Sequence, residues 1–123
     1  MQDMELGVVQ MKFAELLWAN VPIASGEVVR LCEQELQWKK STTYTVLRKL
    51  CEKGLFVNEN GVVQAVVSRD DYYAAKSAQI IDAEFGGSLP AFIAAFAQNK
   101  PLSAKEVDEI QNMIDRFRGG AGT

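Results

Sequence analysis

The spacing of apolar residues predicts three amphipathic helices in the first half of the chain. Apolar side chains recur every three or four positions over residues 5–20, 25–37 and 41–53, as expected for helices that bury one face. Pro22 keeps the residue before it out of the helical region, so a short extended piece is expected there. Gly54 suits the position just after a helix end and is expected to stop the third helix.

The period changes to that of β-strands over residues 55–67. Two β-branched runs flank Asn60 and Gly61, which tolerate the positive φ angles of a type I′ turn, so a β-hairpin is expected. Three helices followed by a hairpin are the order of a winged helix-turn-helix domain. In such a domain the third helix enters the major groove of DNA and the hairpin tip, or wing, touches the adjacent backbone. The pattern predicts a mainly α fold with a small β-hairpin.

Helical spacing returns over residues 68–87, 88–98 and 102–117. These helices carry more large apolar side chains than they can hide alone, and burying each one is worth about 1.5–3 kcal/mol. A symmetric homodimer is therefore expected to cover them. The expected dimer interface consists of Ile80, Ile81, Phe85, Leu89, Phe92, Ile93, Phe96, Ile110, Met113, Ile114 and Phe117.

Hydroxyl residues mark the expected helix starts. Ser25 is expected to cap the second helix, and Ser41 or Thr42 the third. Further along, Ser88 precedes a proline by two positions and Ser103 opens a capping-box sequence.

The length of 123 residues suits one domain, or one small domain with an appended element. The pattern divides it into a winged helix-turn-helix DNA-binding domain (1–68), a helical dimerisation region (69–118) and a flexible tail (119–123). With 48% hydrophobic and 24% charged residues, the composition is that of an ordinary globular protein.

The longest apolar stretches are much shorter than the roughly 20 residues that cross a bilayer. Met1 leads into polar residues, so no secretory signal is indicated. We expect a cytoplasmic protein with no membrane partner.

Charge is unevenly distributed along the chain. Residues 1–69 carry eight basic and eight acidic side chains, whereas residues 70–123 carry five and eight. Within residues 39–53, however, five cations accompany one acid. Binding of nucleic acid depends on local neutralisation of phosphates, so an overall net charge of −3 does not exclude it.

The cationic third helix supplies the candidate DNA-binding residues. Its hydroxyls near the start could reach base edges, and its cations could contact phosphates. A solvated charge run is the alternative, and the order of elements favours DNA. The candidates are Lys39, Lys40, Ser41, Thr42, Tyr44, Thr45, Arg48 and Lys49, with Asn60 and Gly61 at the wing tip.

The sequence offers little for catalysis or metal binding. It has no histidine, no nucleophile elbow and no glycine-rich phosphate loop, and its two cysteines, Cys32 and Cys51, cannot supply the roughly four ligands of a zinc site. Both occupy apolar helical positions, which favours buried, reduced thiols. We expect no enzyme activity, no metal and no cofactor.

Several segments together resemble the penicillinase-repressor and copper-repressor family of bacterial winged-helix regulators (BlaI/MecI/CopY). They are LLW at 16–18, the Glu27–Val28 pair, Trp38 followed by STTYTVLRKLCEKGL, and GGSLPAFIAAF followed by LSAKEVDEI. The resemblance implies a homodimeric repressor whose winged helices occupy the two half-sites of a palindromic operator. The carboxy-terminal helices would hold the two copies together.

Three features depart from the family pattern. The family's wing usually runs E-G-R-x-F-x-Y-x-P. The segment ENGVVQAVVSRDDY lacks the arginine, both aromatics and the proline at the positions of that pattern. The bond aligned with the family's Asn-Phe cleavage site is Ala95–Phe96, so the resemblance does not by itself imply cleavage-based induction. No cysteine-rich copper-sensing tail follows Phe117.

The sequence therefore predicts a homodimeric transcriptional repressor that binds a double-stranded DNA operator through residues 41–53. The alternative is a dimeric winged-helix module for protein interactions, in which the depleted wing and acidic second half have weakened DNA binding.

Overall fold

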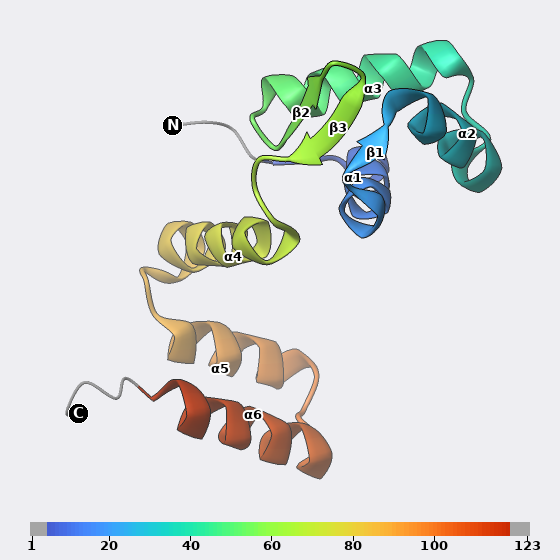
Figure 1. Cartoon of the computed structure of the whole chain (residues 1–123). Helices are drawn as coiled ribbons and strands as arrows, with labels where there is room; N and C mark the ends of the chain where they lie inside the picture. Colours follow the sequence, from blue (N-terminus) through green and yellow to red (C-terminus); the bar gives the residue numbers. More distant parts are fainter. Residues whose placement is uncertain (1–4, 119–123) are drawn as a thin grey trace. The chain divides into compact units, whose positions relative to one another are not determined.

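A computed structural model of the chain describes residues 5–118, which contain six helices and three strands (Figure 1). The expected flexible tail over 119–123 lies outside these residues. The chain forms two compact units, one up to Gln79 and one from Ile80 onward. The elements in chain order are α1 (Val8–Asn20), β1 (Ile23–Ala24), α2 (Ser25–Leu36), α3 (Lys40–Glu52), β2 (Phe56–Glu59), β3 (Val62–Ala65), α4 (Arg69–Phe85), α5 (Leu89–Asn99) and α6 (Ala104–Phe117).

The predicted hairpin is confirmed, and it belongs to a three-stranded antiparallel sheet of order β1-β3-β2. Asn60 (φ 54°) and Gly61 (φ 77°) form its two-residue turn, and Asn58 pairs with Val63 across the two strands. Ile23 of β1 pairs with the same Val63 from the other side. The extended piece expected around Pro22 is thus a third strand, which at two residues is too short to show a period.

The core of the first unit combines side chains from four helices and the sheet. Phe13 and Leu17 of α1, Val28 of α2 and Leu50 of α3 are at most 1% exposed. Tyr72 of α4 is also fully buried. The first turns of α4 therefore complete the core of the winged helix, and the prediction of a winged helix-turn-helix followed by further helices is confirmed.

The expected serine cap of the second helix is wrong. Ser25 is the first residue of α2, and the N-cap position is held by Ala24, which makes no side-chain cap hydrogen bond. Instead, the backbone N–H of Ser25 donates to the carbonyl oxygen of Gly61 at 2.8 Å. A contact with the hairpin turn thus satisfies a donor that a cap leaves to solvent.

The expected cap of the third helix is also wrong. Lys39 is the N-cap residue and Lys40 begins α3, so Ser41 and Thr42 lie within the helix. The preceding helix ends at Gln37 in the left-handed conformation (φ 56°). The chain leaves α2 at this residue, and α3 begins two or three residues earlier than a cap at Ser41 or Thr42 would place it. The predicted stop at Gly54, which has a φ of 82°, is confirmed.

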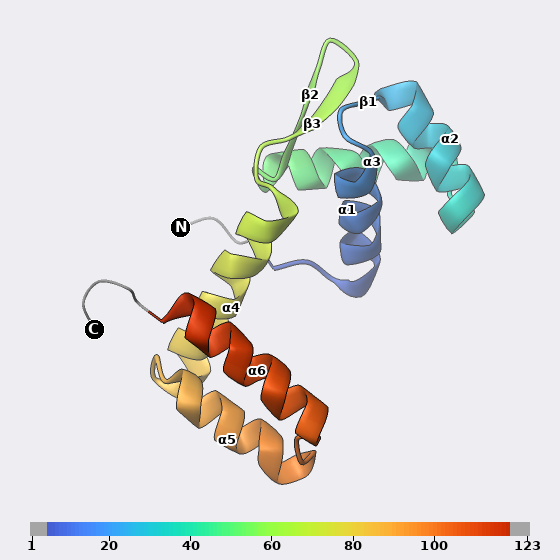
Figure 2. The same cartoon turned by 60° about the horizontal axis from the view of Figure 1, so that its bottom comes forward.

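The second unit contains the end of α4 together with α5 and α6, which lie side by side in both views (Figures 1 and 2). Ser88 caps α5 by accepting a hydrogen bond from the backbone N–H of Ala91 at 3.1 Å. Ser103 and Glu106 form the expected capping box of α6. None of the described residues of this unit, 80–118, is buried.

Among residues 5–118, no single helix is both long and apolar enough to cross a membrane. The helices α4 and α5 would reach that length and composition as a pair, but the chain bends at the break between them.

Candidate nucleic-acid interface

Helix α3 buries one side in the core and exposes the other. Thr43, Leu47 and Leu50 are at most 3% exposed, as their helical spacing predicts. The remaining side chains named as DNA-binding candidates on this helix are solvent-exposed, except for the half-buried Tyr44. The exposed set is Lys40, Ser41, Thr42, Thr45, Arg48 and Lys49, with Lys39 exposed at the N-cap.

Four of the five cations near α3 lie on its exposed side or at its start. The fifth, Lys53, is half-buried at the C-cap, and its Nζ donates to the backbone carbonyl of Glu5 at 2.7 Å. Lys53 therefore ties the N-terminal segment to the end of α3. Lys39 and Lys40 lie where the N–H groups and positive dipole end of a helix attract anions, and the two positive charges add to that attraction.

The hydroxyl groups of α3 are partly used within the helix. Thr45 Oγ1 donates to the carbonyl oxygen of Ser41 at 2.9 Å, and Thr43 Oγ1 donates to that of Lys39 at 3.3 Å. In this rotamer Thr45 presents only acceptor lone pairs outward. The donors that it suits in the major groove are the amino groups of cytosine and adenine.

A groove of about 430 Å³ separates α3 from strand β2. Its walls are Tyr44, Leu47, Arg48 and Cys51 on the helix, with Val57 and Asn58 on the strand. Burial raises the pKa of the Cys51 thiol, which holds it in the neutral form at physiological pH. The sequence did not reveal this groove, since the approach of β2 to α3 depends on the fold rather than on local spacing.

The wing presents little positive charge. Asn60 and Gly61 are exposed at its tip, as is Glu59, the single charged side chain of residues 55–67. Val62 (37% exposed) and Val66 (60% exposed) also face solvent. The wing could therefore offer amide and backbone groups to DNA, while its carboxylate repels phosphates.

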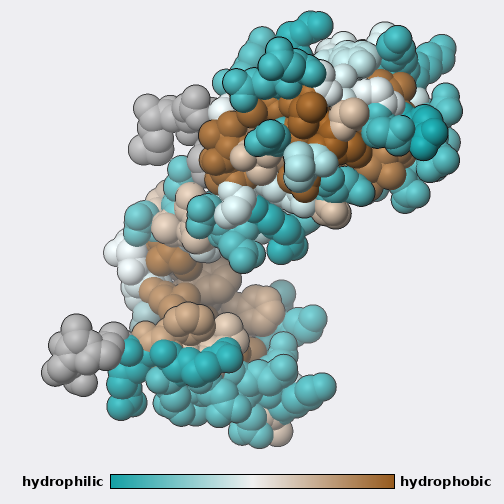
Figure 3. Space-filling view, in the orientation of Figure 1, coloured by the Kyte–Doolittle hydropathy of each residue, from teal (hydrophilic) through white to brown (hydrophobic). Residues whose placement is uncertain are grey.

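The second unit exposes a broad apolar surface. Figure 3 shows brown and tan, apolar atoms around α5 in this part of the chain, with teal, hydrophilic atoms along the side of α6 that is in view. Of the eleven side chains predicted to form a dimer interface, seven are at least 36% exposed, with Phe117 at 76%. The other four, Ile81, Phe85, Ile93 and Ile110, are half-buried. Val107, at 47% exposed, belongs to the same stripe of α6 and was not predicted, although its helical spacing from Ile110 and Ile114 places it there.

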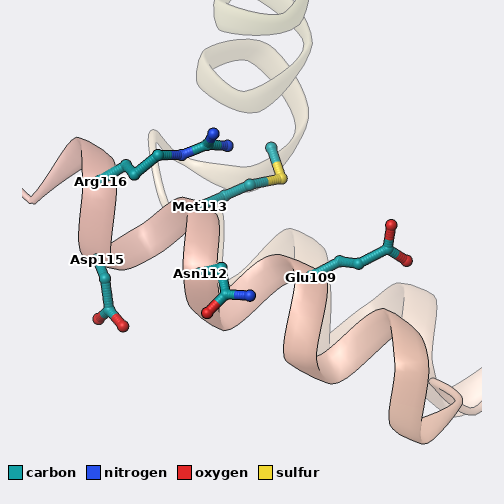
Figure 4. A pocket seen from close by; sticks show the side chains of 5 residues that line it. All are labelled: Glu109, Asn112, Met113, Asp115 and Arg116. Atoms are coloured by element: carbon teal, nitrogen blue, oxygen red, sulfur yellow. The ribbon is translucent and has the colours of Figure 1, made fainter.

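Helix α6 is amphipathic, with this apolar stripe on one side and polar residues on the other. Figure 4 shows Met113 pointing away from Asn112 and Asp115, which project from the opposite side of the helix. These residues, with Glu109 and Arg116, line a hollow of about 610 Å³ along α6. The polar side is solvated, so the apolar side is the one that is available to a partner surface.

In the part of the chain that the structure describes, no three histidine, cysteine or carboxylate side chains lie close enough to hold a metal ion. Cys32 is fully buried, and its pKa is raised because burial disfavours the thiolate.

The sequence profile of the penicillinase repressor family matches residues 6–116. The chain is 23% identical over 113 residues to the penicillinase repressor of Bacillus licheniformis, a match that covers 89% of this chain and 88% of that protein. It is 19% identical over 118 residues to the penicillinase repressor of Staphylococcus aureus (93% and 94% covered). It is 18% identical over 116 residues to the methicillin resistance regulatory protein MecI of Mammaliicoccus sciuri (91% and 94% covered).

These matches confirm the resemblance drawn from the sequence, and they extend over both compact units. The chain belongs to the penicillinase repressor family, which is a family of transcriptional repressors and not a class of enzymes.

Proposed function

We propose that this chain is a homodimeric transcriptional repressor that acts in the cytoplasm and binds a palindromic operator in duplex DNA through α3. The observation that carries the proposal is the cationic, hydroxyl-bearing side of α3, which is exposed while the other side of the helix is buried. Such a helix can enter the major groove without disturbing the core.

The residues of this surface divide by position. Lys39 and Lys40 at the start of α3 bind DNA phosphates. Arg48 and Lys49, two turns further along, contact the DNA backbone beside the major groove. The base edges are read by hydroxyls in the first half of the helix, which are those of Ser41, Thr42 and Thr45. Tyr44 lines the groove between α3 and β2, where it can pack on a sugar, and the wing residues Asn60 and Gly61 approach the neighbouring backbone.

Dimerisation supplies the second winged helix, which binds the second half-site of the operator. The apolar surface of the second unit is larger than the isolated exposed hydrophobic residues that are normal on a monomer. A second copy of the chain covers it symmetrically. Two winged helices joined in this way read a two-fold symmetric operator.

Titration of the chain's own promoter by fluorescence anisotropy at several salt concentrations tests the proposal. Arg48→Ala and Lys49→Ala are expected to weaken binding across all sequences and to reduce the salt slope by about 1 each. Lys105→Ala, which removes an exposed cation from α6, serves as the matched control and is expected to change neither quantity. Binding that survives both α3 substitutions with an unchanged slope would contradict the proposal.

A second candidate is a dimeric winged-helix module that binds proteins rather than DNA. The specific observation in its favour is the wing, whose one charged side chain is Glu59 and whose valines at 62 and 66 are exposed. This candidate predicts that duplex DNA is bound only weakly and without preference for the promoter in the same titration.

A further inference from the structure

Glu15 in the middle of α1 holds the first turn of α4. Its Oε1 accepts a hydrogen bond from Arg69 Nε at 2.6 Å, and its Oε2 accepts one from an Arg69 terminal nitrogen at 3.2 Å. Oε2 also accepts a hydrogen bond from the hydroxyl of Tyr73 at 2.8 Å. One carboxylate thus binds two side chains that lie one helical turn apart on α4. We call these three residues the Glu15 clamp.

Aromatic contacts beside the clamp fix the same turn from a second direction. The indole N–H of Trp18, one turn after Glu15 on α1, donates to the carbonyl oxygen of Val67 at 2.9 Å. Its ring packs against Tyr72 and Tyr73 at centroid distances of 5.4 and 6.5 Å. The Arg69 guanidinium lies 4.8 Å from the centre of the Tyr73 ring. The chain entering α4 is therefore anchored on α1 at its backbone and at three side chains.

The direction of α4 matters because α4 is a single helix that runs from the winged-helix core into the second unit. Tyr72 near its start is buried in the core, whereas Ile80, Ile81 and Phe85 near its end belong to the apolar surface. Loosening its first turn is therefore expected to change the orientation of the helix residues that follow.

We propose that Glu15 is a positioning residue that fixes the direction in which α4 leaves the winged helix, and so sets the spacing of half-sites that the dimer accepts. This inference rests on the proposed function. It adds that spacing is selected at the contact between α1 and α4, far along the chain from the residues that touch DNA.

The geometry explains why the clamp can act on direction with little effect on folding. The side chains of Arg69 and Glu15 are 54% and 37% exposed, and ion pairs of that kind contribute little to stability. The amide of glutamine has only one acceptor oxygen, so Glu15→Gln cannot receive the three hydrogen bonds that the carboxylate accepts. That variant keeps its shape while the first turn of α4 becomes looser.

A spacer series tests the inference. Duplexes that carry two promoter half-sites are made with the native spacer and with spacers changed by about one or two base pairs. The affinity ratio between the best and the altered spacers is expected to fall by about fivefold in Glu15→Gln and in Tyr73→Phe. Affinity for a single half-site is expected to stay at the wild-type value. Glu27→Gln is the matched control, because it breaks the exposed Glu27–Arg30 ion pair within α2.

Hydrogen exchange provides a readout that does not involve DNA. Amides in the first turns of α4 are expected to exchange faster in Glu15→Gln than in the wild type and in Glu27→Gln. Unchanged exchange together with an unchanged spacer ratio in both clamp variants overturns the inference, even when the wild type binds its operator. A wild-type protein that binds no duplex overturns the proposed function instead, and the exchange result still reports whether the clamp holds α4.

Discussion

At the scale of single residues, the wing and the recognition helix make opposite electrostatic contributions. In the proposed DNA complex the cations around α3 attract the phosphate backbone, whereas Glu59 beside the wing tip is an exposed carboxylate. Winged-helix folds place both elements at the DNA. In the proposed DNA complex, the charge of the wing is therefore expected to change affinity without altering base reading.

Glu59→Lys is expected to strengthen operator binding and to increase the salt slope by about 1, since it adds one phosphate contact at the wing. The measurement is anisotropy titration over a range of salt concentrations. Glu109→Lys, the same charge change on α6, is the control and is expected to have a much smaller effect. Equal gains from the two substitutions would show that the wing does not approach DNA.

The Glu15 clamp also gives a pH dependence. Hydrogen bonds from Arg69 and then from Tyr73 lower the pKa of Glu15 below its ordinary value of about 4.3. A lowered folded-state pKa means that the contribution to stability is fully present above the ordinary value and is lost as the pH falls through the folded-state value.

Thermal melts of the wild type and Glu15→Gln are therefore expected to differ most at neutral pH and to converge as the pH falls through the lowered folded-state pKa of Glu15. Hydrogen bonding to Glu15 raises the pKa of Tyr73 above its ordinary value, so the hydroxyl keeps its proton through neutral pH. A difference in melting temperature that stays constant from neutral to acidic pH would contradict this account of the clamp.

At the scale of elements, the helices of the second unit depend on their ends more than those of the first. None of the described residues of α5 and α6 is buried within the chain, so packing contributes less to holding them than it does for α1 or α3. Short helices without buried faces are marginal in water. Their caps therefore contribute a larger share of their stability.

Ser103→Ala, which removes the capping box of α6, is expected to destabilise this helix by about 1 kcal/mol. Helical circular dichroism during urea unfolding measures the loss. Ser77→Ala in α4 is the control, because its hydroxyl donates within its own helix to the carbonyl of Ala74 and caps no terminus. A loss of the same size in the control would show that the cap has no special role.

At the scale of the whole molecule, the apolar stripe of α6 is expected to bring two copies together. Ile114→Glu places a charge in this stripe at a position that is 49% exposed, so the folded monomer tolerates the change. The expected result is a shift from dimer to monomer in sedimentation equilibrium and a loss of two-site operator binding.

Asn112→Glu makes the matching change on the polar side of α6, which faces away from Met113 (Figure 4). This control is expected to remain dimeric. A wild type that sediments as a monomer at high concentration would contradict the proposed dimer. Dissociation of both variants would show that charge in general, rather than the apolar stripe, governs association.

The sequence alone determined the features that depend on neighbouring residues. The stop at Gly54, the turn at Asn60 and Gly61 and the capping box at Ser103 follow from chemistry within a few positions, and the structure confirms all three. The helical periodicity of α3 likewise identified which of its sides is buried.

The tertiary structure alone decided the features that join distant segments. Pairing of Ile23 with Val63 made a strand where two residues show no period, and Gly61 of the hairpin turn accepts a hydrogen bond from the first backbone N–H of α2, at Ser25. The burial of Tyr72 and the bonds of Glu15 to α4 joined the fourth helix to the winged-helix core. Residues up to 58 positions apart meet in these contacts, and periodicity and capping report only on residues within a few turns of one another.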